Sequence, residues 1–262
     1  MPRRLILHAG FHKTGTSTVQ QVLRTNRATL KKHLALRLKP QMKDLLHATR
    51  GYSTWRDPVS LAKAQARFSD LLTGLPGMPR RTLVISAEEL VGHMPGRGQL
   101  TTYSAAPDLL YGFVTSVQSI FPEAEVALYF STRDPQDWLV SAYWEHVKSS
   151  NLTLDFDAFA DRYAAAADLD AIVDEVTARV PCASHRCRIE TCADKPLGPA
   201  DPLLDLCDIP PGLRADLLPH PPVNAREDVD VLVALLAANR AYADRDARKA
   251  AKMAILARAR RR

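Results

Sequence analysis

The sequence predicts a single α/β domain, and three observations lead to that prediction. An apolar stretch beginning at Leu5 runs into a turn rich in glycine and hydroxyl residues and then into a helix. Residues 126–131 are largely apolar on both faces, which is the pattern of a central strand, and a helix follows them. A chain of 262 residues, 46% of them hydrophobic, can bury one substantial core, and this length fits one domain better than two.

Hydrophobic periodicity and turn residues predict the other elements in order. Residues 26–40 are basic and only weakly amphipathic, so we expect no strand there, and we expect a helix to end near Gly51. Later segments are predicted to be an acidic helical scaffold (155–179), a proline-rich loop (219–222) and one long helix from Asp228. The remaining predictions are helices at 16–25, 60–72, 107–121, 135–148 and 202–207, and strands at 82–86, 126–131 and 186–191.

The net charge of +6 favours anionic ligands, but much of the excess lies at the two ends of the chain, in residues 2–4 and 258–262. We therefore assign residues 1–262 to one domain with a basic helical C-terminal tail from about residue 245, which we expect to fray, and we expect no nucleic-acid partner. No apolar run approaches the roughly 18–20 residues of a membrane span. The N-terminus enters a core strand at once instead of a signal-peptide segment, so a cytoplasmic protein is expected.

Four cysteines, Cys182, Cys187, Cys192 and Cys207, lack the closely spaced pairs of a zinc site. His185 lies among the first three, which leaves a metal cluster as the alternative. We favour reduced, partly buried thiols and expect no metal.

A phosphate cradle is predicted where the first strand meets the first helix. Gly10 and Gly15, five residues apart, allow a tight turn whose backbone N–H groups point inward. Lys13 adds a point charge, and Thr16 and Ser17 add hydroxyl donors at the helix N-terminus. The expected occupant is a phosphate or a similar oxyanion.

The position of the lysine narrows the type of cradle. The ordinary nucleotide-hydrolase loop carries lysine directly after its second glycine, whereas here Gly15 is followed by Thr16 and Ser17 and the lysine is residue 13. The run Lys13-Thr14-Gly15-Thr16-Ser17 resembles the 5′-phosphosulfate loop of sulfotransferases that use 3′-phosphoadenosine-5′-phosphosulfate (PAPS). The structural alternative is a plain strand-to-helix turn with a solvated lysine.

A second motif follows the predicted central strand. Arg133 stands at the end of this strand, Asp134 and Pro135 begin the next helix as N-cap and first residue, and Ser141 lies two turns along that helix. The planar fork of an arginine can grip a phosphate, and a serine hydroxyl can reach the same group. This stretch resembles the 3′-phosphate motif of the same family, although Arg133 could instead form a structural salt bridge.

The resemblance covers about the first 150 residues and implies a P-loop-like sulfotransferase fold, in which helices flank a central parallel sheet. It also implies PAPS as donor, no metal, and in-line attack on sulfur by an acceptor hydroxyl or amine. Lys13 would then stabilise the sulfuryl group and the bridging oxygen. Asn224 and Arg226, after the proline-rich loop, could close over the nucleotide. The implied donor-binding residues are His12, Lys13, Thr14, Gly15, Thr16, Ser17, Arg133 and Ser141.

Two departures bear on the branch of the family. Cytosolic members usually carry tryptophan where this chain has Thr18, and their C-terminal Arg-Lys-Gly clasp has no counterpart here. The organisation is more similar to bacterial and carbohydrate-type sulfotransferases, so a carbohydrate or a related polar metabolite is the expected acceptor. Two other functions stay open, namely a Mg²⁺-dependent P-loop kinase of a small molecule and a non-catalytic anion-binding module.

The general base is predicted from position. Glu88 follows the predicted strand 82–86 by one residue, at the sheet edge where ligands bind in open parallel sheets. Its alternatives are His12, Glu89 and His146, since some sulfotransferases use histidine and others glutamate. Either glutamate could instead be a solvated first-turn residue that the helix dipole stabilises.

Overall fold

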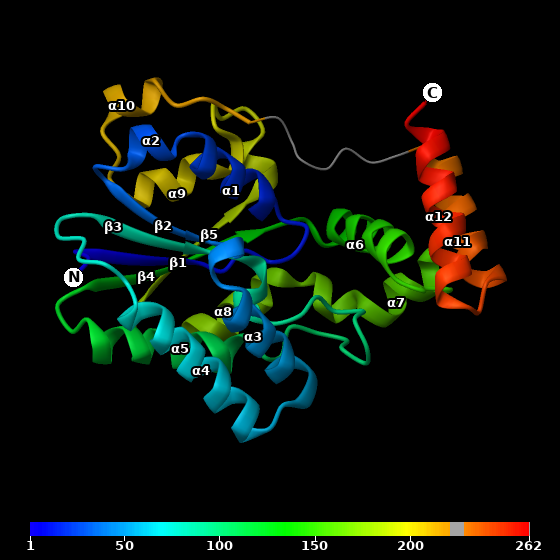
Figure 1. Cartoon of the computed structure of the whole chain (residues 1–262), viewed down its shortest axis with the longest axis horizontal. Coiled ribbons are helices and arrows are strands. Elements are labelled where there is room, and N and C mark those ends of the chain that lie inside the picture. The colour runs from blue at the N-terminus through cyan, green and yellow to red at the C-terminus, as the bar shows by residue number, and fades with distance from the viewer. Residues whose placement is uncertain (221–227, 262) are drawn as a thin grey trace.

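The computed structural model describes residues 1–220 and 228–261, and a parallel sheet forms its centre (Figure 1). Within these residues the sheet has five strands in the order β2-β3-β1-β4-β5, and each neighbouring pair is parallel. The predicted α/β class with a central parallel sheet flanked by helices is therefore confirmed. The strands are β1 (Arg4–His8), β2 (Leu34–Leu38), β3 (Thr82–Ser86), β4 (Glu125–Thr132) and β5 (Ala183–Arg188).

Helices cover both faces of the sheet (Figure 1). One face carries α1 (Thr16–Thr25), α2 (Arg27–Leu30), α9 (Asp201–Leu206) and α10 (Pro211–Ala215). The opposite face carries α3 (Lys43–Trp55), α4 (Pro58–Thr73), α5 (Ala106–Ile120) and α8 (Leu169–Arg179). Beyond the carboxyl edge lie α6 (Pro135–Ser149), α7 (Phe156–Ala167), α11 (Val229–Ala241) and α12 (Arg245–Ala259). Short 3₁₀ turns are η1 (Lys39–Gln41), η2 (Glu88–Val91), η3 (Ile189–Cys192) and η4 (Gly198–Ala200).

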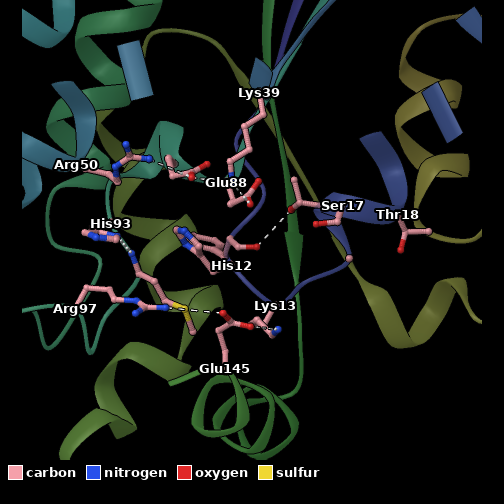
Figure 2. A pocket seen from close by; sticks show the side chains of 15 residues that line it. His12, Lys13, Ser17, Thr18, Lys39, Arg50, Glu88, His93, Arg97 and Glu145 are labelled. Carbon is pink, nitrogen blue, oxygen red and sulfur yellow. Dashed lines mark hydrogen bonds and ion pairs between the residues drawn. The ribbon is translucent and has the colours of Figure 1, made fainter. Parts of the chain in front are cut away.

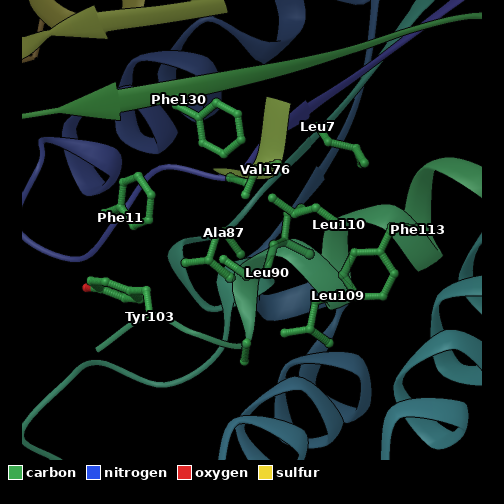
Figure 3. Packing of buried hydrophobic residues seen from close by; sticks show 14 of the residues in the cluster. Leu7, Phe11, Ala87, Leu90, Tyr103, Leu109, Leu110, Phe113, Phe130 and Val176 are labelled. Atoms are coloured by element: carbon green, nitrogen blue, oxygen red, sulfur yellow. The ribbon is translucent and has the colours of Figure 1, made fainter. Parts of the chain in front are cut away.

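Side-chain alternation along β1 divides the hydrophobic core into two layers. Leu5 and Leu7 belong to the cluster packed against α3, α4, α5 and α8, whereas Ile6 belongs to the cluster that contains α1 and α9. In the larger cluster, Leu7 and Phe130 face Leu110 and Val176 (Figure 3). Burial on both faces makes β1 and β4 apolar throughout, which is why the sequence identifies them readily.

Next to β1, the helices that follow neighbouring strands change from one face of the sheet to the other. From β1 the chain passes to α1 on one face, whereas from the adjacent β3 it passes to α5 on the other face (Figure 1). Adjacent parallel strands whose following helices lie on opposite faces leave a crevice at their carboxyl ends, which is the usual ligand position in open α/β sheets. The loop of residues 9–15 occupies this position.

One strand was missed by the sequence predictions, and several predicted boundaries were wrong. The basic segment contains β2, whose five residues are hidden in the sequence by flanking lysines and arginines, so 82–86 is the third strand along the chain and not the second. The late strand covers 183–188 instead of 186–191, and the helix expected to end near Gly51 continues to Trp55. The scaffold 155–179 is two helices, because the Asp168 side chain caps the second of them at Ala171 N.

The C-terminal segment also differs from the expected single helix and frayed tail. It forms two packed helices, α11 and α12, and the Asp244 side chain caps the second by accepting from the amides of residues 246 and 247. Lys252 of α12 is buried and donates to backbone carbonyls near the end of α6. The basic segment is therefore attached to the domain by specific hydrogen bonds. Among the described residues, no helix is both long and apolar enough to cross a membrane.

His8, which the sequence analysis did not single out, links the three central strands. Its Nδ1 lies 2.8 Å from Ser86 Oγ on β3, and its Nε2 lies 3.1 Å from Ser131 Oγ on β4. The imidazole is fully buried, and burial lowers its pKa from 6.5 to about 4. A neutral ring at the carboxyl ends of β1, β3 and β4 thus holds together the edge from which the loop begins.

We expect His8 to make the fold sensitive to mild acid. Its pKa is lower in the folded than in the unfolded state, so the unfolded chain binds more protons as the pH falls below about 6.5. Lowering the pH from about 7 to about 5 should reduce the free energy of unfolding by about 2 kcal/mol through His8 alone. His8→Gln should be less stable at neutral pH but should lose this part of the pH dependence. Denaturant unfolding at both pH values measures it, and an equal pH dependence in both proteins would contradict the assignment.

Candidate active site

The loop between β1 and α1 is tightly folded. Lys13 and Gly15 both have positive φ angles, of 68° and 83°. Glycine adopts the second of these without steric strain because it has no Cβ atom. At Gly10 a Cβ atom would lie 2.3 Å from Thr16 Oγ1, so only glycine fits. A lysine held in the left-handed region is an uncommon conformation, and such residues cluster at functional sites.

The N-terminus of α1 is prepared for an anion. Gly15 is the N-cap, provides no side-chain acceptor, and no acidic residue lies in the first turn. The first-turn amides therefore keep their donors directed at the loop, and the helix dipole adds partial positive charge. Thr14 differs from its neighbours because its side chain is fully buried and its hydroxyl donates to Phe11 O at 2.7 Å. Only the backbone of Thr14 could contact a ligand.

Two cavities meet at this loop, and Lys13, Gly15 and Thr18 line both. The first, which we call the Glu88 cavity, has a volume of about 570 Å³ and also contains His12, Thr16 and Ser17. The second, the Arg133 cavity, has a volume of about 390 Å³ and contains Arg133 and Ser141. The two predicted motifs thus lie next to each other in space, because Arg133 and Ser141 line a cavity that the loop of the first motif also lines.

The Arg133 cavity is closed by residues that the sequence did not indicate. Ile189, Cys192 and the turn of residues 195–199 form its wall opposite the loop. Arg133 Nη1 donates to Lys13 O at 3.1 Å, and its Nε lies 4.0 Å from Glu190 Oε1. Arg133 therefore has a structural contact with the loop in addition to its place in the cavity. Asn224 and Arg226, predicted to close over the nucleotide, lie outside the described residues.

The Glu88 cavity is strongly charged (Figure 2). Lys13 Nζ lies 3.2 Å from Glu145 Oε2, and Arg97 Nη2 lies 3.8 Å from Glu145 Oε1. Glu145 therefore connects the loop lysine to the segment after β3. Five further residues of this wall carry no local sequence signal, because they come from separate segments that only the fold brings together: Lys39, Arg50, His93, Arg97 and Glu145.

Glu88 and Glu89 share one cation. Lys39 Nζ lies 2.6 Å from Glu88 Oε1 and 2.7 Å from Glu89 Oε1. Burial favours the neutral acid, but for Glu88 the nearby His12 ring and Lys39 ammonium outweigh it, and the pKa of Glu88 lies below its ordinary value. For Glu89, burial and the charge of Glu88 raise the pKa instead. Glu88 is therefore the carboxylate that stays ionised.

The two histidine candidates occupy different surroundings. His12 lines the Glu88 cavity with its Nδ1 3.2 Å from Tyr103 Oη, and burial lowers its pKa to about 3, so the ring is neutral at pH 7. His146 is fully buried, lies in neither cavity, and has its Nε2 2.7 Å from Pro95 O. Position therefore supports His12, and not His146, as an alternative to Glu88.

All four cysteines are free thiols, and Cys187 Sγ lies 3.3 Å from Cys192 Sγ. In the part of the chain that the structure describes, no group of three or more histidine, cysteine or carboxylate side chains could hold a metal ion.

Comparison with protein-family models gives no match, and comparison with curated proteins gives none either.

Proposed function

We propose that the protein is a PAPS-dependent sulfotransferase that moves a sulfuryl group to a hydroxyl, or an amine, of a carbohydrate or small polar acceptor. The observation that supports this most is the loop shared by two cavities. A donor bound along the loop would extend its nucleotide into the Arg133 cavity and expose its sulfuryl group to the Glu88 cavity. The transfer needs this arrangement, because the acceptor must approach sulfur from the side opposite the leaving phosphate.

The residues fit the donor in three places. The uncapped amides of α1, with Thr16 and Ser17, suit the 5′-phosphate. Arg133 and Ser141 line one cavity and suit the 3′-phosphate. Lys13 lines both cavities and suits the bridging oxygen, where negative charge increases as the bond from sulfur to the phosphate oxygen breaks.

The hydroxyl or amine that receives the sulfuryl group must lose a proton during the transfer, so a general base is needed next to it. As the acceptor oxygen forms its bond to sulfur, its proton passes to Glu88, and 3′-phosphoadenosine 5′-phosphate (PAP) leaves with the electron pair of the broken bond. Glu88 is ionised and lines the cavity, while Lys39 orients one of its oxygens. The kinase alternative would need carboxylates available for Mg²⁺, but both glutamates after β3 are paired with Lys39.

Nucleotide selectivity tests the class of enzyme. We expect PAP to bind the wild-type protein without metal and more tightly than ATP with Mg²⁺, because the Arg133 cavity supplies partners for a 3′-phosphate that ATP lacks. Isothermal titration calorimetry with each nucleotide measures both affinities. If ATP with Mg²⁺ binds tightly and PAP does not, the kinase is favoured. If neither nucleotide binds, the proposed function is contradicted.

Arg133→Ala should weaken PAP binding by roughly 2–5 kcal/mol if the guanidinium is a desolvated phosphate partner, compared with about 1 kcal/mol or less for a surface ion pair. Arg188→Ala is the matched control, because Arg188 is exposed, pairs with Asp170 and lines neither cavity. Calorimetry on natively folded variants gives the comparison. Wild-type affinity in Arg133→Ala would exclude its role in the second motif.

Glu88→Gln should slow turnover by about 10²–10⁴-fold and leave PAP affinity nearly unchanged, because the amide keeps the shape and loses the basicity. Because the pKa of Glu88 is lowered, wild-type turnover should fall only when the pH drops below the ordinary carboxyl range. Labelled-donor assays over a range of acceptors measure both effects.

Glu89→Gln is the control for Glu88→Gln, since Glu89 shares Lys39 and lines the same cavity, and its effect should be much smaller. If Glu88→Gln keeps near wild-type turnover while His12→Ala loses it with intact PAP binding, the base is His12.

A further inference from the structure

A third cavity lies away from the loop, where the end of α6 meets the beginning of α12. It has a volume of about 550 Å³, and we call it the cationic cavity. Its hydroxyl and amide groups come from Ser149, Ser150 and Asn151, and no carboxylate of the described residues lines it. Its cationic residues are Lys148, Arg245, Arg248, Lys249 and Lys252.

Few acids of the described residues offset the positive charge of this cavity; Glu145, on the preceding turn of α6, lies close enough to Lys148 for this lysine to help lower the pKa of Glu145. Among the described residues, no carboxylate forms an ion pair with Lys148, Arg245 or Lys249, and Arg248 donates to the backbone carbonyls of residues 242 and 243. Burial, with the charges of Arg248 and Arg97, lowers the pKa of Lys252 to about 8. By contrast, the Glu88 cavity combines its cations with three glutamates.

The cavity is held in shape by Lys252, which is buried. Its Nζ donates to Val147 O at 2.6 Å, to Ser150 O at 2.7 Å and to Asn239 Oδ1 at 2.9 Å. These bonds join α12 to α11 and to the end of α6, and α11 and α12 lie side by side next to α6 and α7 (Figure 1). The cations at the rim are therefore presented by a fixed surface.

The cationic cavity adjoins the Glu88 cavity through one arginine. Arg97 lines the Glu88 cavity and donates to both the backbone oxygen and the hydroxyl of Ser149, which lines the cationic cavity. Glu145, one turn earlier on α6, pairs with Lys13. Arg97 therefore lies between the two cavities, and an extended ligand that fills both would cross this arginine.

We propose that the cationic cavity binds the carboxylate or sulfate groups of an extended, negatively charged saccharide whose reacting end lies in the Glu88 cavity. This inference rests on the proposed function, and it specifies the acceptor as an anionic chain instead of a small neutral sugar. The lining combines cationic, hydroxyl and amide groups, which suit the anionic and hydroxyl groups of a saccharide, with apolar surface that suits the C–H faces of sugar rings. A membrane-surface helix would present a broad apolar face, whereas Met253 and Leu256 are the only apolar residues that line this cavity in the described part of the chain.

Binding of a heparin oligosaccharide, compared with a neutral maltooligosaccharide of the same length, tests the proposal. The test variant is Arg245→Ser with Lys249→Ser, two exposed residues at the rim. The control is Lys31→Ser with Lys32→Ser, which removes the same charge from exposed positions that line none of the three cavities. PAP affinity is measured on each protein by calorimetry.

We expect heparin binding to the wild type, a loss of about 3- to 30-fold in the test variant as two surface charge contacts are removed, and little change in the control. PAP affinity should be equal in all three proteins. Equal heparin losses in test and control, no heparin binding, or binding of phosphatidylserine vesicles in its place would overturn the anion site. If PAP fails to bind while the heparin result holds, the proposed function fails and the anion site stands.

Discussion

The close packing of the loop against the carboxyl end of β1 is the constraint on which the candidate site depends. Gly10 leaves no room for a side chain beside Thr16 and His8, and Gly15 takes the left-handed conformation from which α1 begins. His8, directly before the loop, joins β1 to β3 and β4 through two serines. Any shift of β1 relative to these strands would therefore move Lys13 and the amides of α1 together.

Charge at the site is arranged in pairs that leave defined positions for a ligand. Glu145 holds Lys13, and Lys39 lies between Glu88 and Glu89, so the Glu88 cavity contains cations and carboxylates in comparable number. Partial burial strengthens these interactions and separates the pKa values of the two neighbouring glutamates. The lining of the cationic cavity at α12 contains no carboxylate of the described residues, so the two regions differ in charge.

The sequence predicted local features well where the signal lies within a few residues. The apolar strands β1, β3 and β4, the caps at Asp134 and Pro135, and the glycine turn all appear where expected. It failed at β2, because basic flanking residues obscure a short apolar alternation, and at the breaks near Asp168 and Asp244, where a single capping aspartate divides a helical pattern.

By itself the sequence determined the α/β class and the two motifs around Lys13 and Arg133, because a turn, a cap or a buried strand depends on neighbouring residues. Only the tertiary structure decided that the Arg133 motif lies beside the loop of Lys13 and that this loop lines two cavities. It also decided that Lys39, Arg97 and Glu145 complete the Glu88 cavity and that the basic C-terminal segment is bound to α6. These contacts join residues that are far apart in the chain, and their positions follow from sheet order and helix packing, which no local pattern encodes.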